Sequence, residues 1–274
     1  MAQELTDNSK ISLSPSDETA EPFIHDDEVF IRMTLAGRLQ HAVLMICFVL
    51  LVLTGLPLLI DPSVWLHKIF SIENSFAWRG LIHRTAGTGL IILSIYHLFY
   101  VSCTRRGREI FRALMPVTRD ITDVLEAFGH NLGFTRWIHR KGYFKDLLDR
   151  HPYWLFTEPP QFGRYNFIEK LEYLSVWWGN FVMIISGFFL WAKNLSFRLF
   201  PIWVYDIFKL VHSYEAVLAF LAILIWHLYN VHLSPEVFPM SKVWINGKIT
   251  GYELRKQHPL EYREILIKRM GRKS

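Results

Sequence analysis

The chain has 274 residues, of which 51% are hydrophobic, 15% aromatic and 20% charged. This composition excludes a disordered or fibrous protein, and the slightly positive mean hydropathy makes a membrane protein the first hypothesis to test. The net charge is +5, but no basic groove interleaved with base-stacking aromatic residues accompanies it, so we expect no nucleic-acid partner.

Four segments of 20 or more residues contain no Lys, Arg, Asp or Glu: 39–60, 85–104, 173–192 and 216–235. Each is long enough to cross about 30 Å of hydrocarbon at about 1.5 Å per residue. We therefore expect an all-α integral membrane four-helix bundle. The predicted domain is 38–235, with spans at about 39–60, 83–104, 173–192 and 210–235, an N-terminal tail 1–37 and a C-terminal tail 236–274.

The positive charges are distributed unevenly about these spans. Of the 30 Lys and Arg residues, 24 fall in the two tails and the long loop 105–172, and six fall in or near the two short loops. The positive-inside rule then predicts that both tails and the long loop are cytoplasmic. The first span follows a polar segment, so we expect a retained helix and not a cleaved secretory signal.

The long loop contains one further helical pattern. Apolar residues recur at helical spacing over 105–128, which predicts a cytoplasmic amphipathic segment at the membrane surface. Prolines and a glycine predict a loop over 150–165. The two cysteines, Cys47 and Cys103, form no Cys-x-x-Cys pair, which excludes a disulfide framework, an iron–sulfur cluster and a covalently attached c-type haem.

Five of the twelve histidines lie in the spans or at their edges: His41, His83, His97, His212 and His227. His83 and His97 are 14 residues apart, which places them within about 40° of one face and about 21 Å apart along a helix. His212 and His227 are 15 residues apart, offset by about 60° and about 22 Å. The second and fourth spans run in the same direction, so these four rings are expected to meet as two pairs at different depths.

Two imidazoles that face each other across a helix bundle suit a non-covalent bis-histidine haem. The small residues expected against such rings are present at Gly55, Ala86, Gly87, Gly89, Ser186 and Gly187. Arg84 could meet a haem propionate. The alternatives are histidines that only pack helices or relay protons, and a zinc or proton transporter. A transporter would normally add carboxylates inside the spans, whereas Glu215 sits only at the mouth of the fourth run.

Four stretches carry a resemblance to a known family: RLQHAVLMICFVLLVLTGL (38–56), LIHRTAGTGLIILSIYHLFYVSCTRRGRE (81–109), RYNFIEKLEY (164–173) and VHSYEAVLAFLAILIWHLYNVH (211–232). Together they resemble the b-type di-haem cytochrome subunit (gamma subunit) of membrane-bound formate dehydrogenases and related nickel–iron hydrogenases and thiosulfate reductases. A wider similarity extends to the cytochrome b of quinol-oxidising complexes. The resemblance covers roughly residues 38–240.

The resemblance implies two b haems, with His83 and His212 as axial ligands of the outer one. For the inner haem, the quinol-complex pattern implies His97 with His227, and the formate dehydrogenase pattern implies His41 with His227. Helical geometry favours His97, and the closer family favours His41, which we expect to be the ligand.

The same family places a quinone site before the third span. Asn166 matches its asparagine and Lys170 a neighbouring lysine. The family's glycine corresponds to Ile168 here, and Asn166 could instead be a helix N-cap.

These observations predict an electron-transfer subunit, and not an enzyme alone, that passes electrons between a redox partner subunit and the quinone pool. The resemblance implies an iron–sulfur or cytochrome partner on the periplasmic side and menaquinone or ubiquinone as substrate. The expected location is the bacterial or archaeal cytoplasmic membrane, among its lipids. The alternatives are a stand-alone quinol-oxidising cytochrome b that feeds a multihaem cytochrome, and a haem-free structural anchor.

Overall fold

The computed structural model describes residues 23–59, 75–133, 161–235 and 237–271. Within them, four helical rods are long and apolar enough to cross a membrane, over Leu35–Leu58, Ala77–Cys103, Phe167–Trp191 and Ile202–Leu233. Large apolar side chains are exposed along all four rods, as expected where lipid and not water surrounds the bundle. The protein is an all-α membrane bundle, as the sequence predicts.

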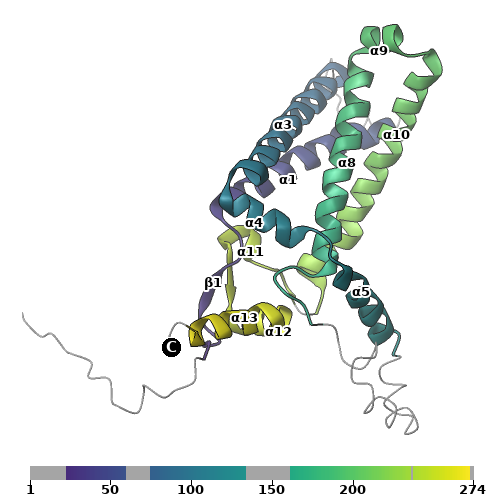
Figure 1. Cartoon of the computed structure of the whole chain (residues 1–274). Helices are drawn as coiled ribbons and strands as arrows, with labels where there is room; N and C mark the ends of the chain where they lie inside the picture. The colour runs from purple at the N-terminus through teal and green to yellow at the C-terminus, as the bar shows by residue number, and fades with distance from the viewer. Residues whose placement is uncertain (1–22, 60–74, 134–160, 236, 272–274) are drawn as a thin grey trace, which may run out of the picture.

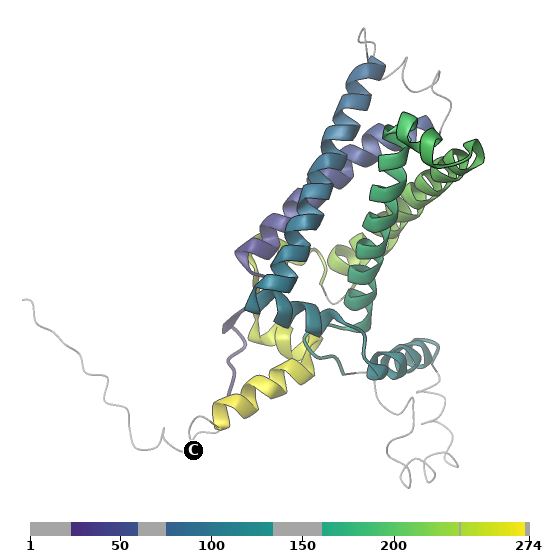
Figure 2. The same cartoon turned by 45° about the horizontal axis from the view of Figure 1, so that its top comes forward.

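The bundle consists of two helical pairs (Figures 1 and 2). Helix α1 (Leu35–Gly55) continues into a short 3-10 turn, η1 (Leu56–Leu58), and packs mainly against α3 (Ser75–Cys103). Helix α8 (Phe167–Trp191) packs mainly against α10 (Ile202–Leu221), and α9 (Lys193–Leu199) joins them at the end farthest from the C-terminus. The two pairs touch through α1 with α10 and through α3 with α8.

The fourth rod changes its winding on the way to its end. After α10 it continues as two π-helical segments, η2 (Ala222–His227) and η3 (Tyr229–Leu233). Leu228 N–H donates to Ile223 O, five residues back, where an α-helix would use the residue four back. Such segments concentrate at functional sites, and this one carries His227.

The helices begin before the uncharged runs that predict them. α10 begins at Ile202, so Glu215 lies well inside the rod and not at its mouth. Its carboxylate faces α8: a Cβ on Gly179 would lie 2.8 Å from Glu215 Oε1. α8 likewise includes Glu172. Our sequence argument against a transporter, which relied on the lack of carboxylates in the spans, is therefore wrong.

The amphipathic segment 105–128 is two helices and not one. Helix α4 covers Arg105–Leu114 and α5 covers Thr118–Asn131. Met115 has extended backbone (ψ 138°), because the proline at 116 disfavours the helical region for the residue before it.

Of the loop predicted over 150–165, residues 161–165 contain no helix or strand, and the rest lies outside the described residues.

Parts of both tails fold together beneath the bundle into a small cap (Figure 1). Strand β1 (Val29–Ile31) pairs antiparallel with β2 (Lys248–Thr250), followed by α12 (Gly251–Gln257) and α13 (Pro259–Met270). The short helix α11 (Val243–Asn246) precedes β2. The guanidinium of Arg32 bridges Glu261 of α13 (2.9 Å) and Glu169 of α8 (3.3 Å), which ties the cap to the membrane bundle.

Candidate functional site

At the end of the bundle near α9, two histidines face each other across the two helical pairs. His83 of α3 and His212 of α10 have ring centroids 6.4 Å apart, with planes 68° apart. We call them the outer pair, after the side that the sequence predicts for them. They join one helix of the first pair to one helix of the second.

Hydrogen bonds to hydroxyl groups favour one tautomer of both outer histidine rings. Thr54 Oγ1 lies 2.9 Å from His83 Nδ1, and Ser186 Oγ lies 2.9 Å from His212 Nδ1. Each hydroxyl also donates to the carbonyl four residues before it, at 2.5 Å for Thr54 and 2.7 Å for Ser186. With its hydrogen used there, the hydroxyl accepts from the Nδ1–H of the histidine, so Nε2 is the nitrogen with a free lone pair.

At the other end, His41 of α1 and His227 of η2 form the inner pair. Their ring centroids are 6.3 Å apart, with planes 42° apart. His227 Nδ1 lies 3.0 Å from Glu172 Oε2 in α8, and the other carboxylate oxygen lies 3.5 Å from Asn230 Nδ2. His41 Nδ1 is buried and has no hydrogen-bond partner among the described residues.

The spacing of both pairs fits a metal centre between the rings. Two metal–nitrogen bonds of about 2.0 Å, with about 1.2 Å from each nitrogen to its ring centroid, give about 6.4 Å. Direct packing of the two rings would not require this distance to recur in both pairs. Glycines also leave room at the outer pair: a Cβ on Gly55 would lie 3.2 Å from His83 Cε1, and one on Gly187 3.0 Å from His212 Cε1. Both pairs therefore fit a bis-histidine haem.

His97 has a different environment. Its Nδ1 lies 2.7 Å from Gln40 Oε1, and its Nε2 lies 3.0 Å from the Tyr173 hydroxyl. Both ring nitrogens are thus engaged by protein groups. The structure places His41, and not His97, opposite His227.

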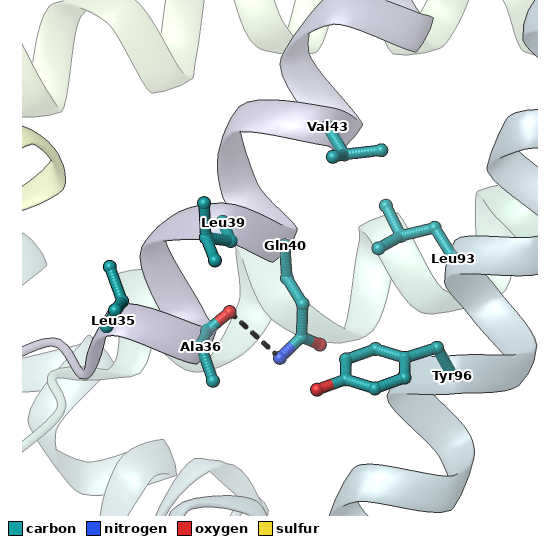
Figure 3. A pocket seen from close by; sticks show the side chains of 7 residues that line it. All are labelled: Leu35, Ala36, Leu39, Gln40, Val43, Leu93 and Tyr96. Carbon is teal, nitrogen blue, oxygen red and sulfur yellow. Dashed lines mark hydrogen bonds between the residues drawn. The ribbon is translucent and has the colours of Figure 1, made fainter.

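Gln40 also borders a groove of about 410 Å³ between α1 and α3 (Figure 3). Its walls are mainly apolar, and the ring of Tyr96 lies beside the Gln40 side chain. Gln40 Nε2 donates to Ala36 O at 3.2 Å, which leaves Gln40 Oε1 to accept from His97. Hydrogen bonds therefore run from the wall of this groove through His97 to Tyr173 in α8.

The remaining predicted site residues make no hydrogen bond to the four facing rings within the described part of the chain. Arg84 is exposed, and its guanidinium folds back over Gly80, where a Cβ would lie 3.6 Å from Nη1. Asn166 is the N-cap of α8, because its Oδ1 accepts from Glu169 N at 2.8 Å and Glu169 in turn accepts from Asn166 N. Lys170 is buried and its ammonium pairs with Asp120 of α5 at 2.8 and 3.0 Å.

Sequence reasoning missed the residues that orient the rings. Thr54 and Glu172 were not singled out, and Ser186 was noted only for its size. Arg79 was missed as well, although its Nη1 donates to Thr54 O at 2.8 Å beside His83. Polar residues inside apolar runs are the one available signal, but the sequence does not say which histidine each of them meets across the helix boundary. Within the described residues, no group of three or more His, Cys, Asp or Glu side chains could hold a metal ion by protein ligands alone.

Comparison of the sequence with known proteins identifies the family of this chain. The family described as prokaryotic cytochrome b561 matches residues 32–237. The nitrate-inducible formate dehydrogenase cytochrome b556(Fdn) subunit of Escherichia coli (strain K12) is 24% identical over 238 residues, which cover 87% of this chain and 92% of that protein. The formate dehydrogenase cytochrome b556 subunit of Haemophilus influenzae is 24% identical over 247 residues, covering 90% and 88%. The chain therefore belongs to the prokaryotic cytochrome b561 family, as a bacterial membrane cytochrome b that carries haem b and takes part in electron transfer.

Proposed function

We propose that the chain holds two b haems, one between His83 and His212 and one between His41 and His227. The observation that carries this proposal is the recurrence of two facing histidine pairs with nearly equal centroid distances, 6.4 and 6.3 Å. In three of the four rings an acceptor at Nδ1 leaves Nε2 for the iron. His97 is the weaker candidate, because its two nitrogens already have protein partners.

A bound b haem supplies one-electron transfer, and the chain supplies position and surroundings. Thr54 and Ser186 hold the outer rings by hydrogen bonds, and the glycines at 55 and 187 keep space beside them. For the haem propionates on this side, Arg84 and Arg79 are candidate cations, one and four residues from His83 in the sequence. At the inner pair, buried polar atoms without a partner among the described residues include Arg38 Nε and Trp244 Nε1, which are donors available to an anionic group.

The proposed role is electron transfer across the membrane between a redox partner subunit and the quinone pool. The two relatives are named as subunits of formate dehydrogenases, which supports a catalytic partner subunit for this chain as well. We place that iron–sulfur or cytochrome partner on the periplasmic side, next to the outer pair. The distribution of Lys and Arg supports this orientation, with both termini in the cytoplasm.

We place the quinone at the inner end, where cytoplasmic protons are close. The amide nitrogen of Asn166 has no hydrogen-bond partner among the described residues, so it can donate to a quinone oxygen. Lys170 would have to leave Asp120 to take part. The groove beside Gln40 is apolar at membrane depth and leads to the chain of hydrogen bonds through His97, which suits the approach of an isoprenoid quinone.

The experiment that tests the haem proposal measures haem per chain on the purified protein. We expect two b haems, and about half of the absorbance in His83→Ala. His25→Ala, which alters an exposed histidine outside the bundle, is the control and should retain both. Full haem content in His83→Ala would refute the outer site, and a chain without b-haem absorbance would be a structural anchor.

Reoxidation of the reduced haems by a quinone analogue tests the proposed quinone site. Asn166→Ala should keep both haem signals and slow reoxidation. The capping hydrogen bond is also lost in Asn166→Ala, so Asn166→Asp is the matched control: it retains the cap and removes the amide donor. Unchanged reoxidation in both variants would place the quinone elsewhere.

A further inference from the structure

The two proposed haem sites differ in the groups that accept from Nδ1. In the outer pair both acceptors are neutral hydroxyls, Thr54 and Ser186, each already engaged with its own helix. In the inner pair the acceptor for His227 is the carboxylate of Glu172. A carboxylate is a stronger acceptor than a hydroxyl, so the two sites have unequal ligand environments.

Glu172 is held in place by contacts on both of its oxygens. Oε2 lies 3.0 Å from His227 Nδ1 and Oε1 lies 3.5 Å from Asn230 Nδ2 in η3. Only about 20% of its side chain is exposed. A carboxylate in a membrane-spanning helix is costly unless it is paired, and such residues are usually functional. His227 and Asn230 both belong to the π-helical part of the fourth rod. Glu172 therefore links α8 to this part of the rod.

We propose that Glu172 is a positioning residue that orients His227 with Nε2 toward the iron and lowers the midpoint potential of the inner haem relative to the outer one. This inference rests on the proposed two-haem function. A carboxylate acceptor shifts electron density onto the imidazole, raises its basicity as a ligand and stabilises the ferric over the ferrous state. At the outer pair, the neutral acceptors Thr54 and Ser186 stabilise the ferric state to a smaller extent.

The test is a redox titration of the purified full chain, followed optically and by electron paramagnetic resonance of the ferric haems. Haem content is measured first, and His41→Ala identifies the inner wave as the one that is lost. In Glu172→Gln we expect both haems to be retained, the inner midpoint potential to rise and the inner ferric signal to shift, with the outer wave unmoved. Glu172→Asp, which keeps the charge, should bring the inner midpoint back toward that of the unaltered chain.

Two controls separate this role from a general effect. Glu215→Gln removes the other carboxylate noted within the helices, which lies where a Cβ on Gly179 would meet it and has no hydrogen bond to a histidine among the described residues, so it should leave the inner midpoint unchanged. Ser186→Ala should move the outer wave only. An inner midpoint that stays constant in Glu172→Gln, or that shifts equally in Glu215→Gln, would overturn the inference while two haems per chain still support the proposed function. If Glu172→Gln loses the inner haem, Glu172→Asp decides: retention at the original midpoint supports the role, and a raised midpoint contradicts it.

Discussion

Individual side chains decide which histidines are available to a metal. His41 and His97 both lie near the inner end of the bundle, and spacing along one helix favoured His97. In the structure, Gln40 and Tyr173 engage both nitrogens of His97, whereas His41 Nδ1 is buried without a partner among the described residues, and this difference favours the proposed assignment to His41. Hydrogen-bond partners on other helices are not readable from the sequence of one helix.

This difference predicts opposite outcomes for two substitutions. His41→Ala should lose one of the two proposed haems, about half of the b-haem absorbance, because His227 is left with no opposing ring. His97→Ala should keep both and alter only the hydrogen bonds of Gln40 and Tyr173. Pyridine haemochrome assays on the purified variants measure the content. Loss of a haem in His97→Ala, with retention in His41→Ala, would reverse the assignment.

The glycine beside His212 gives a second prediction at this scale. A Cβ on Gly187 would lie 3.0 Å from His212 Cε1, closer than packed side chains normally approach. Gly187→Ala should therefore displace the ring and lower the occupancy of the outer haem. In helix interiors Ala is favoured over Gly by about 0.5–1 kcal/mol, so a weakened helix would not explain such a loss. Gly87→Ala is the matched control, since its Cβ would lie 3.9 Å from Leu51 in ordinary contact.

At the scale of elements, the four apolar rods were readable from charge-free runs, and their ends were not. The rods extend past those runs because terminal polar groups find partners, as Arg79 does with Thr54 O and Lys170 with Asp120. The π-helical winding of η2 and η3 has no equally clear sequence signal. The cap elements also escaped prediction, since their helices and strands are short and are held by contacts between distant parts of the chain.

Helix α5 carries an exposed apolar face that leads to a prediction. Ile121, Leu125 and Phe128 recur at helical spacing and are 67%, 47% and 63% exposed, while Asp120 faces Lys170 of α8. An exposed stripe of this kind beside a membrane-spanning helix is typical of an interfacial helix. A polarity-sensitive dye on Ile121→Cys, with Cys47 and Cys103 replaced by Ser, should report an apolar, lipid-quenchable environment. Arg119→Cys on the opposite face should report water, and equal spectra at the two positions would contradict membrane contact.

Across the whole molecule, the described tail segments 23–34 and 237–271 are held to each other and to the bundle by charged and polar contacts. Arg32 bridges α8 and α13, Arg164 donates to Glu261 at 2.8 Å, and β1 pairs with β2. Ile24 and Leu254 are both fully buried within the cap. Breaking one ion pair of a buried arginine leaves its charge poorly compensated and weakens the other pair. We therefore expect the cap to open as a unit.

His258 makes the stability of this cap depend on pH. It is 5% exposed, and its Nδ1–H donates to Gly163 O at 2.8 Å. Burial, with the nearby charge of Arg32, lowers the pKa of His258 from 6.5 to about 4. The folded cap therefore keeps His258 neutral between these values, while the unfolded chain takes up a proton as the pH falls below 6.5. The stabilisation from neutral His258 is complete above pH 6.5 and is lost as the pH falls toward 4, by about 3 kcal/mol in total.

Limited proteolysis or hydrogen exchange over 237–271, measured from pH 7.5 to pH 4.5 on the membrane-embedded chain, tests this prediction. After correction for the pH dependence of intrinsic amide exchange, opening of the cap should increase steadily below pH 6.5, while the protection of the membrane helices stays constant. His258→Gln retains a side-chain donor for Gly163 O and cannot titrate, so it should flatten the pH dependence over this range. If the variant keeps the same pH dependence, other groups such as the carboxylates around Arg32 control the opening, and His258 does not.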